Sequence, residues 1–174
     1  MSTDNPPFRI IPAQSSEHIN AVRGLFTAYT AWLGLDLTFQ GFAAELQSLP
    51  GQYAAPCGEL LLAYSTEGDT PIGCAAVRPL KQSSDAERGV SGGDCCEMKR
   101  LYVVPEARGM GLGKALMNAA IQRAKDLGYT EMRLDTLPSM QGAVQLYERL
   151  GFLEIPAYYE TPLEGTLFLA LELR

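Results

Sequence analysis

A glycine-rich stretch, RGMGLGKA at 108–115, constrains the fold of this chain more than any other feature of its sequence. It follows the apolar run CCEMKRLYVVP at 95–105, which is typical of a strand, and it precedes a segment whose apolar residues recur with helical spacing up to Gly128. A strand, a glycine turn and a long helix in this order present the free backbone N–H groups of a helix N-terminus, which bind anions such as phosphate. The stretch therefore predicts an α/β fold with an anion site at this turn.

The spacing of the glycines excludes two familiar nucleotide loops. A Walker A loop needs glycine at 108 and Ser or Thr at 115, where the chain has Arg108 and Ala115. The dinucleotide fingerprint G-x-G-x-x-G, begun at either of the first two glycines, needs a third glycine where Lys114 or Leu116 stands. A plain turn before a helix, without a ligand, stays open at this point.

Length and charge narrow the class of protein. A chain of 174 residues is long enough for one well-formed core, so we expect a single domain over 1–174. The formal charge of −6 argues against non-specific binding to nucleic acid or to an anionic membrane. Between Glu97 and Lys125, however, six cations stand against two anions. A basic island in an acidic chain suits a small anionic ligand.

The chain shows no targeting or metal-binding pattern. Its first residues, MSTDNPPFRI, lack a basic segment and an apolar segment, and no run approaches the roughly 18 apolar residues of a membrane helix. We therefore expect a cytoplasmic protein without membrane association. The four cysteines include no C-x-x-C pair and there is one histidine, His18, so we expect reduced, mostly packing cysteines, no metal site and no histidine-based nucleophile.

Hydrophobic periodicity predicts the order β-α-α-β-β-β-α-β-α-β-β and hence a mixed α/β domain. We expect strands at 8–13, 59–66, 71–80, 95–105, 129–137, from 152 and at 166–173, and helices at 15–34, 39–48, 113–128 and 140–151. The second and third strands are expected to form a hairpin. The polar stretch 81–94 is expected to be a loop that is either functional or mobile.

The strand at 95–105 has a defect in its alternation. Apolar residues stand at even positions before Lys99 and at odd positions after Arg100, so the inward face changes parity between them. A β-bulge at this point explains the change. A strand buried on both faces, where parity carries no information, is the alternative.

The segment EMKRLYVVPEARGMGLGKAL at 97–116 resembles the acyl-CoA-binding motif of the Gcn5-related N-acetyltransferases (GNAT), with Arg108, Gly111 and Gly113 filling its pattern [QR]-x-x-G-x-[GA]. Downstream, AVQLYERLGF at 143–152 resembles the second helix of that family and the strand after it. The resemblance covers 8–173 in element order and 95–152 in diagnostic residues. It implies a GNAT-like fold, with a mostly antiparallel twisted sheet, splayed parallel central strands and about four flanking helices.

The resemblance also implies the ligand, which is acetyl-CoA as a cosubstrate, without a metal. Backbone amides of the glycine turn would hold the pyrophosphate, and the pantetheine arm would run along the strand beside 101–103. The bulge would splay the strands 95–104 and 130–137 and leave backbone donors unpaired. The implied cofactor-binding residues are Leu101, Tyr102, Val103, Arg108, Gly109, Met110, Gly111, Leu112, Gly113 and Lys114.

Acetyl transfer to an amine needs a base for the amine proton, a donor for the carbonyl oxygen and an acid for the leaving thiolate. The resemblance implies Glu97 as the base, acting directly or through water, with a solvent-exposed strand carboxylate as the alternative. It implies a backbone N–H near Tyr102 or Val103 as the donor. Tyr147 would protonate the thiolate, and the alternative for it is a core tyrosine. Met140 stands where many members carry a cofactor-binding Asn, so either Ser139 or the backbone substitutes for that Asn, or the pantetheine is held differently.

The sequence gives the least information about the residues that bind the acceptor amine. Arg78 and Arg100 are candidates to receive a carboxylate, for instance that of an amino acid. We expect an N-acetyltransferase that acts on a primary amine of a small molecule, an amino acid or a peptide terminus, by direct attack in a ternary complex. A homodimer is an open possibility. A non-catalytic acyl-CoA sensor and, more remotely, a nucleotide-phosphate module are the alternatives.

Overall fold

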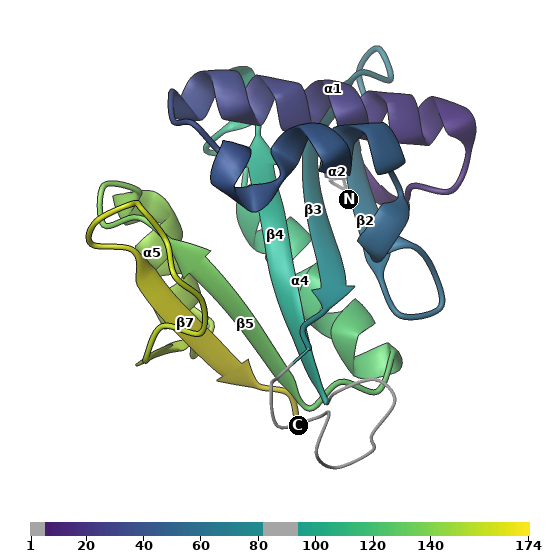
Figure 1. The fold of residues 1–174 in the computed structure, drawn as a ribbon. Helices are drawn as coiled ribbons and strands as arrows, with labels where there is room; N and C mark the ends of the chain where they lie inside the picture. The colour runs from purple at the N-terminus through teal and green to yellow at the C-terminus, as the bar shows by residue number, and fades with distance from the viewer. Residues whose placement is uncertain (1–5, 82–93) are drawn as a thin grey trace.

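The computed structural model describes residues 6–81 and 94–174, which form a seven-stranded sheet (Figure 1). The spatial order of the strands is β1-β2-β3-β4-β5-β7-β6, and the neighbouring strands β4 and β5 run parallel while the other pairs are antiparallel. The strands are β1 (Phe8–Pro12), β2 (Glu59–Ser65), β3 (Pro71–Pro79), β4 (Cys95–Val103), β5 (Glu131–Thr136), β6 (Leu153–Ile155) and β7 (Leu167–Glu172). Most of the predicted loop at 81–94 lies outside the described residues.

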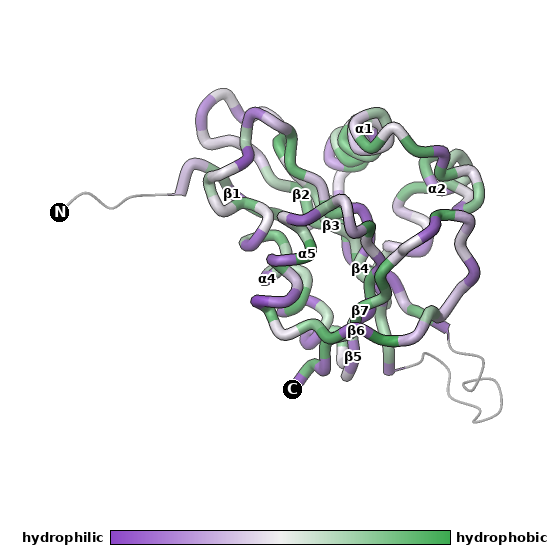
Figure 2. The backbone as a smooth tube through the Cα atoms, turned by 90° about the vertical axis from the view of Figure 1, so that its left-hand side faces the viewer, coloured by the Kyte–Doolittle hydropathy of each residue, from purple (hydrophilic) through white to green (hydrophobic). Residues whose placement is uncertain are grey.

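Helices cover both faces of the sheet, and the predicted mixed α/β fold is confirmed. Figure 2 shows α1 and α2 on one side of the sheet and α4 and α5 on the other. The helices are α1 (Ser16–Leu33), α2 (Phe42–Ser48), α4 (Leu112–Asp126) and α5 (Gln141–Arg149), and short 3₁₀ turns lie at Thr38–Gln40, Gly51–Tyr53 and Pro105–Ala107.

The predicted helix at 39–48 is interrupted. Gly41 has a φ of 68°, in the left-handed region that ends a helical turn. The chain therefore makes the 3₁₀ turn Thr38–Gln40 first and begins α2 at Phe42. This break places Gln40 in the turn, from which its side chain reaches toward β4.

Each strand of the sheet centre contributes to two cores. On β2, Leu61 and Ala63 belong to the core beneath α4 and α5, and the alternate residues Leu60 and Leu62 belong to the core beneath α1. Phe26 of α1 is fully buried in the second core. The sheet is therefore covered on both faces, and a polar side chain in its middle strands is buried unless a cavity reaches it.

The predicted β-bulge in β4 is confirmed. The β3–β4 register shifts between Cys74 and Ala76, and Arg100 has a φ of 58°. Met98 lies in the core beneath α4, and Leu101 packs against the same core, so the inward face changes parity as predicted. The strand is also buried on both faces. The structure therefore contains both features that were offered as explanations of the pattern, the bulge and the two-sided burial.

The pairing between β4 and β5 is short. It covers Cys95 to Glu97 on β4 and Glu131 to Arg133 on β5, whereas β5 stays paired with β7 as far as Thr136. Beyond Glu97 the two parallel strands diverge, as Figure 1 shows. The predicted splayed pair of central strands is confirmed, and it opens the sheet at its middle.

In the two described ranges, no helix is both long and apolar enough to cross a membrane. Over the same ranges, no three side chains of His, Cys, Asp or Glu are grouped so that they could hold a metal ion. Cys57 is exposed, and the other three cysteines are buried.

Candidate functional site

The glycine stretch lies between β4 and α4, where the sequence places it. Gly109 and Gly111 have φ values of 85° and 80°, which only glycine adopts without strain. Gly111 is the N-cap of α4, and no side chain caps that helix end. The N–H groups of the first helical turn therefore lack a side-chain partner, and a phosphate fits such a helix end.

Arg108 contacts both the end of β4 and α1. Its Nε donates to the carbonyl oxygen of Val103 at 3.0 Å, and its guanidinium lies 4.4 Å from the ring centroid of Trp32. The guanidinium is therefore held against α1. Lys114 is exposed on the first turn of α4. The Leu112 side chain is buried, so only its backbone can face a ligand.

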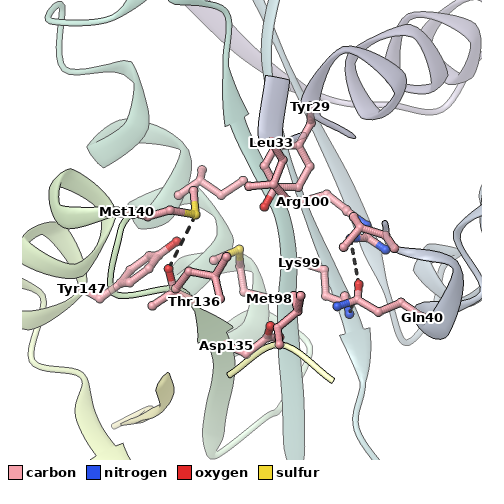
Figure 3. A pocket seen from close by; sticks show the side chains of 15 residues that line it. Tyr29, Leu33, Gln40, Met98, Lys99, Arg100, Asp135, Thr136, Met140 and Tyr147 are labelled. Atoms are coloured by element: carbon pink, nitrogen blue, oxygen red, sulfur yellow. Dashed lines mark hydrogen bonds between the residues drawn. The ribbon is translucent and has the colours of Figure 1, made fainter. Parts of the chain in front are cut away.

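A cavity occupies the place where β4 and β5 separate (Figure 3). It extends from α5 on one side of the gap to α1 and the 3₁₀ turn at Thr38–Gln40 on the other. Its lining residues are Tyr29, Leu33, Leu37, Gln40, Met98, Lys99, Arg100, Leu101, Asp135, Thr136, Leu137, Met140, Ala143, Tyr147 and Leu163.

Tyr147 lines the α5 side of this cavity and is only 5% exposed. Burial raises the pKa of its hydroxyl, and the nearby Tyr29 and Asp135 raise it further, so the group keeps its proton at neutral pH. Met140 lies close by, with its Sδ accepting a long hydrogen bond of 4.0 Å from the Thr136 hydroxyl. Ser139, named above as a substitute for the missing Asn, is exposed and does not line the cavity.

Glu97 is buried, and both of its carboxylate oxygens accept hydrogen bonds. It is 1% exposed, so the alternative of a solvent-exposed carboxylate is wrong. Its Oε2 accepts from Arg78, with Nη2 at 2.7 Å and Nε at 2.9 Å, and its Oε1 accepts from the Tyr158 hydroxyl at 3.0 Å. Arg78 also donates to Gln52 at 2.8 Å. Glu97 does not line the cavity between the strands, and Arg78 lines a separate pocket beneath α2.

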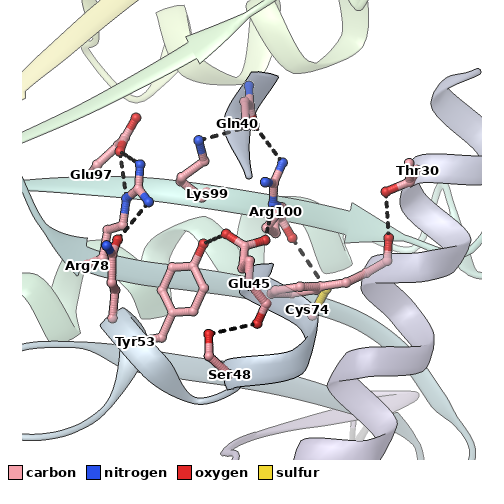
Figure 4. A network of polar contacts seen from close by, with 12 residues as sticks. Thr30, Gln40, Glu45, Ser48, Tyr53, Cys74, Arg78, Glu97, Lys99 and Arg100 are labelled. Carbon is pink, nitrogen blue, oxygen red and sulfur yellow. Dashed lines mark hydrogen bonds and ion pairs between the residues drawn. The ribbon is translucent and has the colours of Figure 1, made fainter. Parts of the chain in front are cut away.

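The bulge turns two consecutive cations to the same side of the sheet (Figure 4). The Oε1 atom of Gln40 accepts from Lys99 Nζ at 3.3 Å and from Arg100 Nη1 at 3.0 Å. Arg100 Nε donates to Glu45 Oε2 at 2.9 Å. Burial lowers the pKa of Lys99, and the neighbouring cations Arg100 and Arg78 lower it further. Both cations line the cavity.

Asp135 also lines the cavity, and the sequence analysis did not identify it. Burial raises the pKa of its carboxyl, and the negative charge of Glu97 adds to the shift while Lys99 opposes it. Its sequence signal is weak, because β5 alternates the charged residues Glu131, Arg133 and Asp135 with the apolar Met132 and Leu134 of the other face. Asp135 is half-buried, and an acid with a raised pKa that lines a cavity is a candidate functional group.

The structure thus brings together some of the predicted site residues and separates others. Tyr147, Leu101 and Arg100 line one cavity, and the glycine loop stands at the end of β4 beside it. Tyr102 belongs to the core beneath α1, and Val103 packs against the opposite core. Glu97 and Arg78 form an ion pair outside the cavity.

Comparison with known families shows to which family the chain belongs. The family described as Acetyltransferase (GNAT) matches residues 27–152. The chain belongs to the GNAT acetyltransferase family. The family predicted from the two motifs is therefore confirmed.

Relatives of this GNAT protein are described as N-acetyltransferases. An uncharacterised N-acetyltransferase of Schizosaccharomyces pombe is 40% identical, with 86% of this chain and 85% of the relative covered. An uncharacterised N-acetyltransferase of Dictyostelium discoideum is 29% identical over 92% of this chain and 97% of its own. The protein is accordingly an acetyl-CoA-dependent acetyltransferase.

Solved structures confirm the GNAT fold. A Klebsiella pneumoniae protein assigned as an acyl-CoA N-acyltransferase superposes with a TM-score of 0.69 at 28% identity, covering 98% of this chain and 100% of that one. A Salmonella typhimurium protein assigned as an acetyltransferase, solved with its cofactor acetyl-CoA, gives a TM-score of 0.64 at 19% identity, with 97% and 95% covered.

Proposed function

We propose that this GNAT protein transfers the acetyl group of acetyl-CoA to a primary amine of a small molecule, an amino acid or a peptide terminus, by direct attack in a ternary complex. One observation carries the proposal. The cavity between β4 and β5 is continuous from Tyr147 of α5 and Met140, the N-cap of that helix, to Lys99 on β4 and Asp135 on β5. A single space therefore offers room for a thioester at one end and an amine at the other.

The cofactor side of the proposal rests on the residues carried over from the family motif. The bare N-terminus of α4, beginning after Gly111, suits the pyrophosphate. The stretch of β4 beyond Glu97 has no pairing with β5, so the backbone groups at 101–103 that point away from β3 are available to a pantetheine arm, except the Val103 carbonyl, which accepts from Arg108. In this proposal a backbone N–H near Tyr102 or Val103 donates to the thioester oxygen as negative charge builds on it.

The transfer step needs two proton movements. The amine nitrogen attacks the carbonyl carbon of the thioester, the C–S bond breaks, and Tyr147 gives its hydroxyl proton to the departing thiolate. Tyr147 lines the cavity and keeps its proton at neutral pH, so a proton is available when the thiolate forms. The amine proton passes to Glu97 through an intervening water. Direct contact is not proposed, since both oxygens of Glu97 already accept hydrogen bonds and the residue lies outside the cavity.

A thiol-release assay tests the proposed function. Purified protein is incubated with acetyl-CoA and a broad panel of amines, amino acids and short peptides, and free CoA is measured together with the mass of the product. We expect release of CoA that depends on an amine and yields one N-acetylated product per thiol. Calorimetry with CoA on the same preparation serves as the control for folded, binding-competent protein. Tight CoA binding without release across the panel would contradict acetyl transfer to amines.

A further inference from the structure

The acceptor side of the cavity holds two charges of opposite sign that have no ion-pair partner. Lys99 on β4 and Asp135 on β5 line the cavity, yet neither forms a salt bridge with any described residue. By contrast, Arg78 is paired with Glu97, and Arg100 with Glu45. Lys99 is buried with only the neutral Gln40 as its acceptor in the described ranges, and Asp135 is half-buried, so a ligand that supplies an opposite charge to each is favourable.

Arg100 adds a buried donor without a partner. Its side chain is 4% exposed, and its Nε and Nη1 donate to Glu45 and Gln40. Its Nη2 is buried and has no hydrogen-bond acceptor among the described residues, although Arg100 lines the cavity. A guanidinium with an open donor beside an ammonium group is a favourable site for a carboxylate.

The positions of these groups fit a zwitterion. Lys99 and Arg100 stand on β4 and Asp135 stands on β5, beyond the last paired residues of the two strands. Paired strands lie about 4.8 Å apart, and these strands have diverged, so a small group fits between the opposite charges. A carboxylate next to the cations and an ammonium next to Asp135 would relieve both unfavourable burials at once.

The remaining wall on this side is mainly apolar. Leu33, Leu37 and Leu163 line the cavity together with the ring of Tyr29. Such a wall favours an apolar substituent over a charged one.

We propose that the acceptor is a free α-amino acid with an apolar side chain, its carboxylate bound by Lys99 and Arg100 and its amino group by Asp135. This inference rests on the proposed acetyl transfer to an amine and narrows the substrate class. Burial raises the pKa of Asp135 and lowers the pKa of Lys99 even though each opposes the shift of the other, so a ligand that brings a further opposite charge to either group is favourable.

Four acceptors built on one skeleton test the inference. Leucine carries both charges, whereas leucinamide, leucylglycine and 3-methylbutan-1-amine keep the amine without the neighbouring carboxylate. We expect kcat/KM for leucine to exceed that of each of the other three by about 10- to 100-fold, because an acceptor without a carboxylate leaves the Lys99 charge and the Arg100 Nη2 donor without a counterpart. Equal or better turnover of leucylglycine or the plain amine overturns the inference and leaves acetyl transfer intact. Absence of release with any amine counts against the proposed function itself.

Two variants separate the two charges. Lys99→Gln is expected to lower kcat/KM for leucine about 10-fold or more, mainly through KM, and to leave 3-methylbutan-1-amine within about 3-fold. Asp135→Asn is expected to lower kcat/KM for both acceptors, since both present an amine. Lys125→Gln, which removes an exposed cation at the end of α4, is the matched control and should change neither.

Binding supplies a readout that does not depend on turnover. Leucine should bind the CoA complex in calorimetry, and Lys99→Gln should weaken that binding by a similar factor. Arg100→Lys, which keeps the charge but removes the open Nη2, should weaken it less. A Lys99→Gln variant that folds normally and binds leucine as the wild type does overturns the assignment of the carboxylate site.

Discussion

The two ends of the central cavity are built in different ways. The proposed cofactor end combines Leu101 of β4, Tyr147 of α5 and Met140, the N-cap of α5, with the glycine turn that follows β4 and does not itself line the cavity. The acceptor end combines side chains from α1, the 3₁₀ turn at Thr38–Gln40, β4, β5 and the segment before β7. The first end depends on backbone conformation, and the second depends on side chains that tertiary folding brings together.

This difference explains how each end recognises its ligand. Backbone amides at a glycine turn and a helix N-terminus bind any pyrophosphate of the right shape, so this end needs few specific side chains. In the proposed acceptor site, Lys99 and Asp135 would be selective because each charge is unfavourable until a ligand supplies its counter-charge. Substitutions at the two ends should therefore produce different kinds of defect, and four changes test that expectation.

The largest effect is expected at Tyr147, which lies in the wall of the cofactor end. Tyr147→Phe removes the proposed acid and keeps the aromatic ring, whose centroid lies 5.8 Å from that of Phe152. Turnover should fall about 100-fold, while the affinity for acetyl-CoA should change less than about 2-fold. Steady-state kinetics and calorimetry measure the two quantities separately.

Tyr129→Phe is the control for losing a phenol. Its hydroxyl donates to the carbonyl oxygen of Cys57 at 2.6 Å, away from the cavity, so turnover should be unaffected. An unchanged turnover number in Tyr147→Phe would remove the acid role and leave Tyr147 as a core residue.

The next effect concerns the glycine turn. Gly111 has a φ of 80°, and nothing lies within 4 Å of a Cβ built there, so strain rather than a clash opposes substitution. A β-branched residue in this conformation costs about 1–2 kcal/mol. Gly111→Val should therefore weaken CoA binding about 10-fold.

Gly113 provides the matched comparison for Gly111. It lies within α4 without a positive φ, and the nearest atom to an added Cβ is 4.0 Å away. Gly113→Ala should bind CoA as the wild type does and should be at least as stable, because alanine favours the helix. Equal losses in both variants would show that the turn acts through side-chain volume and not through backbone conformation.

The same contrast explains what the sequence could predict. The strand, glycine turn and helix at 95–128 are contiguous and the structure confirms them, while the anion site that their spacing predicts stays a prediction; the parity change around Lys99 and Arg100 located the bulge that the register shift confirms. The splay of β4 and β5 followed from the family resemblance. Each of these features is set by local backbone conformation, which a local pattern records.

The acceptor end left no comparable pattern. Gln40 reaches the cavity because Gly41 breaks a helix, and Asp135 becomes a site residue only because β4 moves away from β5. Arg78 and Arg100 have the same sequence signal, a charged residue in an apolar strand, but Arg78 is fully paired with Glu97 and Gln52 while Arg100 keeps an open Nη2. The identity of the partner is a tertiary property, and spacing along the chain does not record it.

A smaller effect, on stability, is expected at Asp135. Burial raises the pKa of this carboxyl in the folded protein, so its favourable contribution is fully present below the ordinary carboxyl pKa and is lost as pH rises through the raised value. At pH values above the raised pKa the ionised group therefore destabilises the fold. Asp135→Asn should raise Tm at pH 7, and relief of about 1 kcal/mol corresponds to about 2–4 °C in a domain of this size.

The gain at Asp135 should disappear as pH falls toward the ordinary carboxyl range, where wild type and variant both carry a neutral group. Asp36 is the control with the opposite sign, because hydrogen bonds from Thr38 lower its pKa. Asp36→Asn should give no gain at pH 7. Thermal unfolding between pH 4 and pH 8 measures both, and a gain at Asp135 that does not vary with pH would exclude burial of its charge as the cause.

The smallest effect should come from the contact that ties the cofactor loop to α1. Arg108 lies 4.4 Å over the Trp32 ring, and Trp32 is 45% exposed, so the cation–π attraction is worth about 0.5–1 kcal/mol. Trp32→Leu should free Arg108 and weaken CoA binding about 2- to 5-fold. Trp32→Phe, which keeps an aromatic face, should lose less than Trp32→Leu. Because Trp32 does not line the cavity, the KM for the acceptor should stay constant in both variants. A change confined to the acceptor KM would mean that α1 contributes to the acceptor end alone. The contact between Trp32 and Arg108 would then have no part in binding CoA.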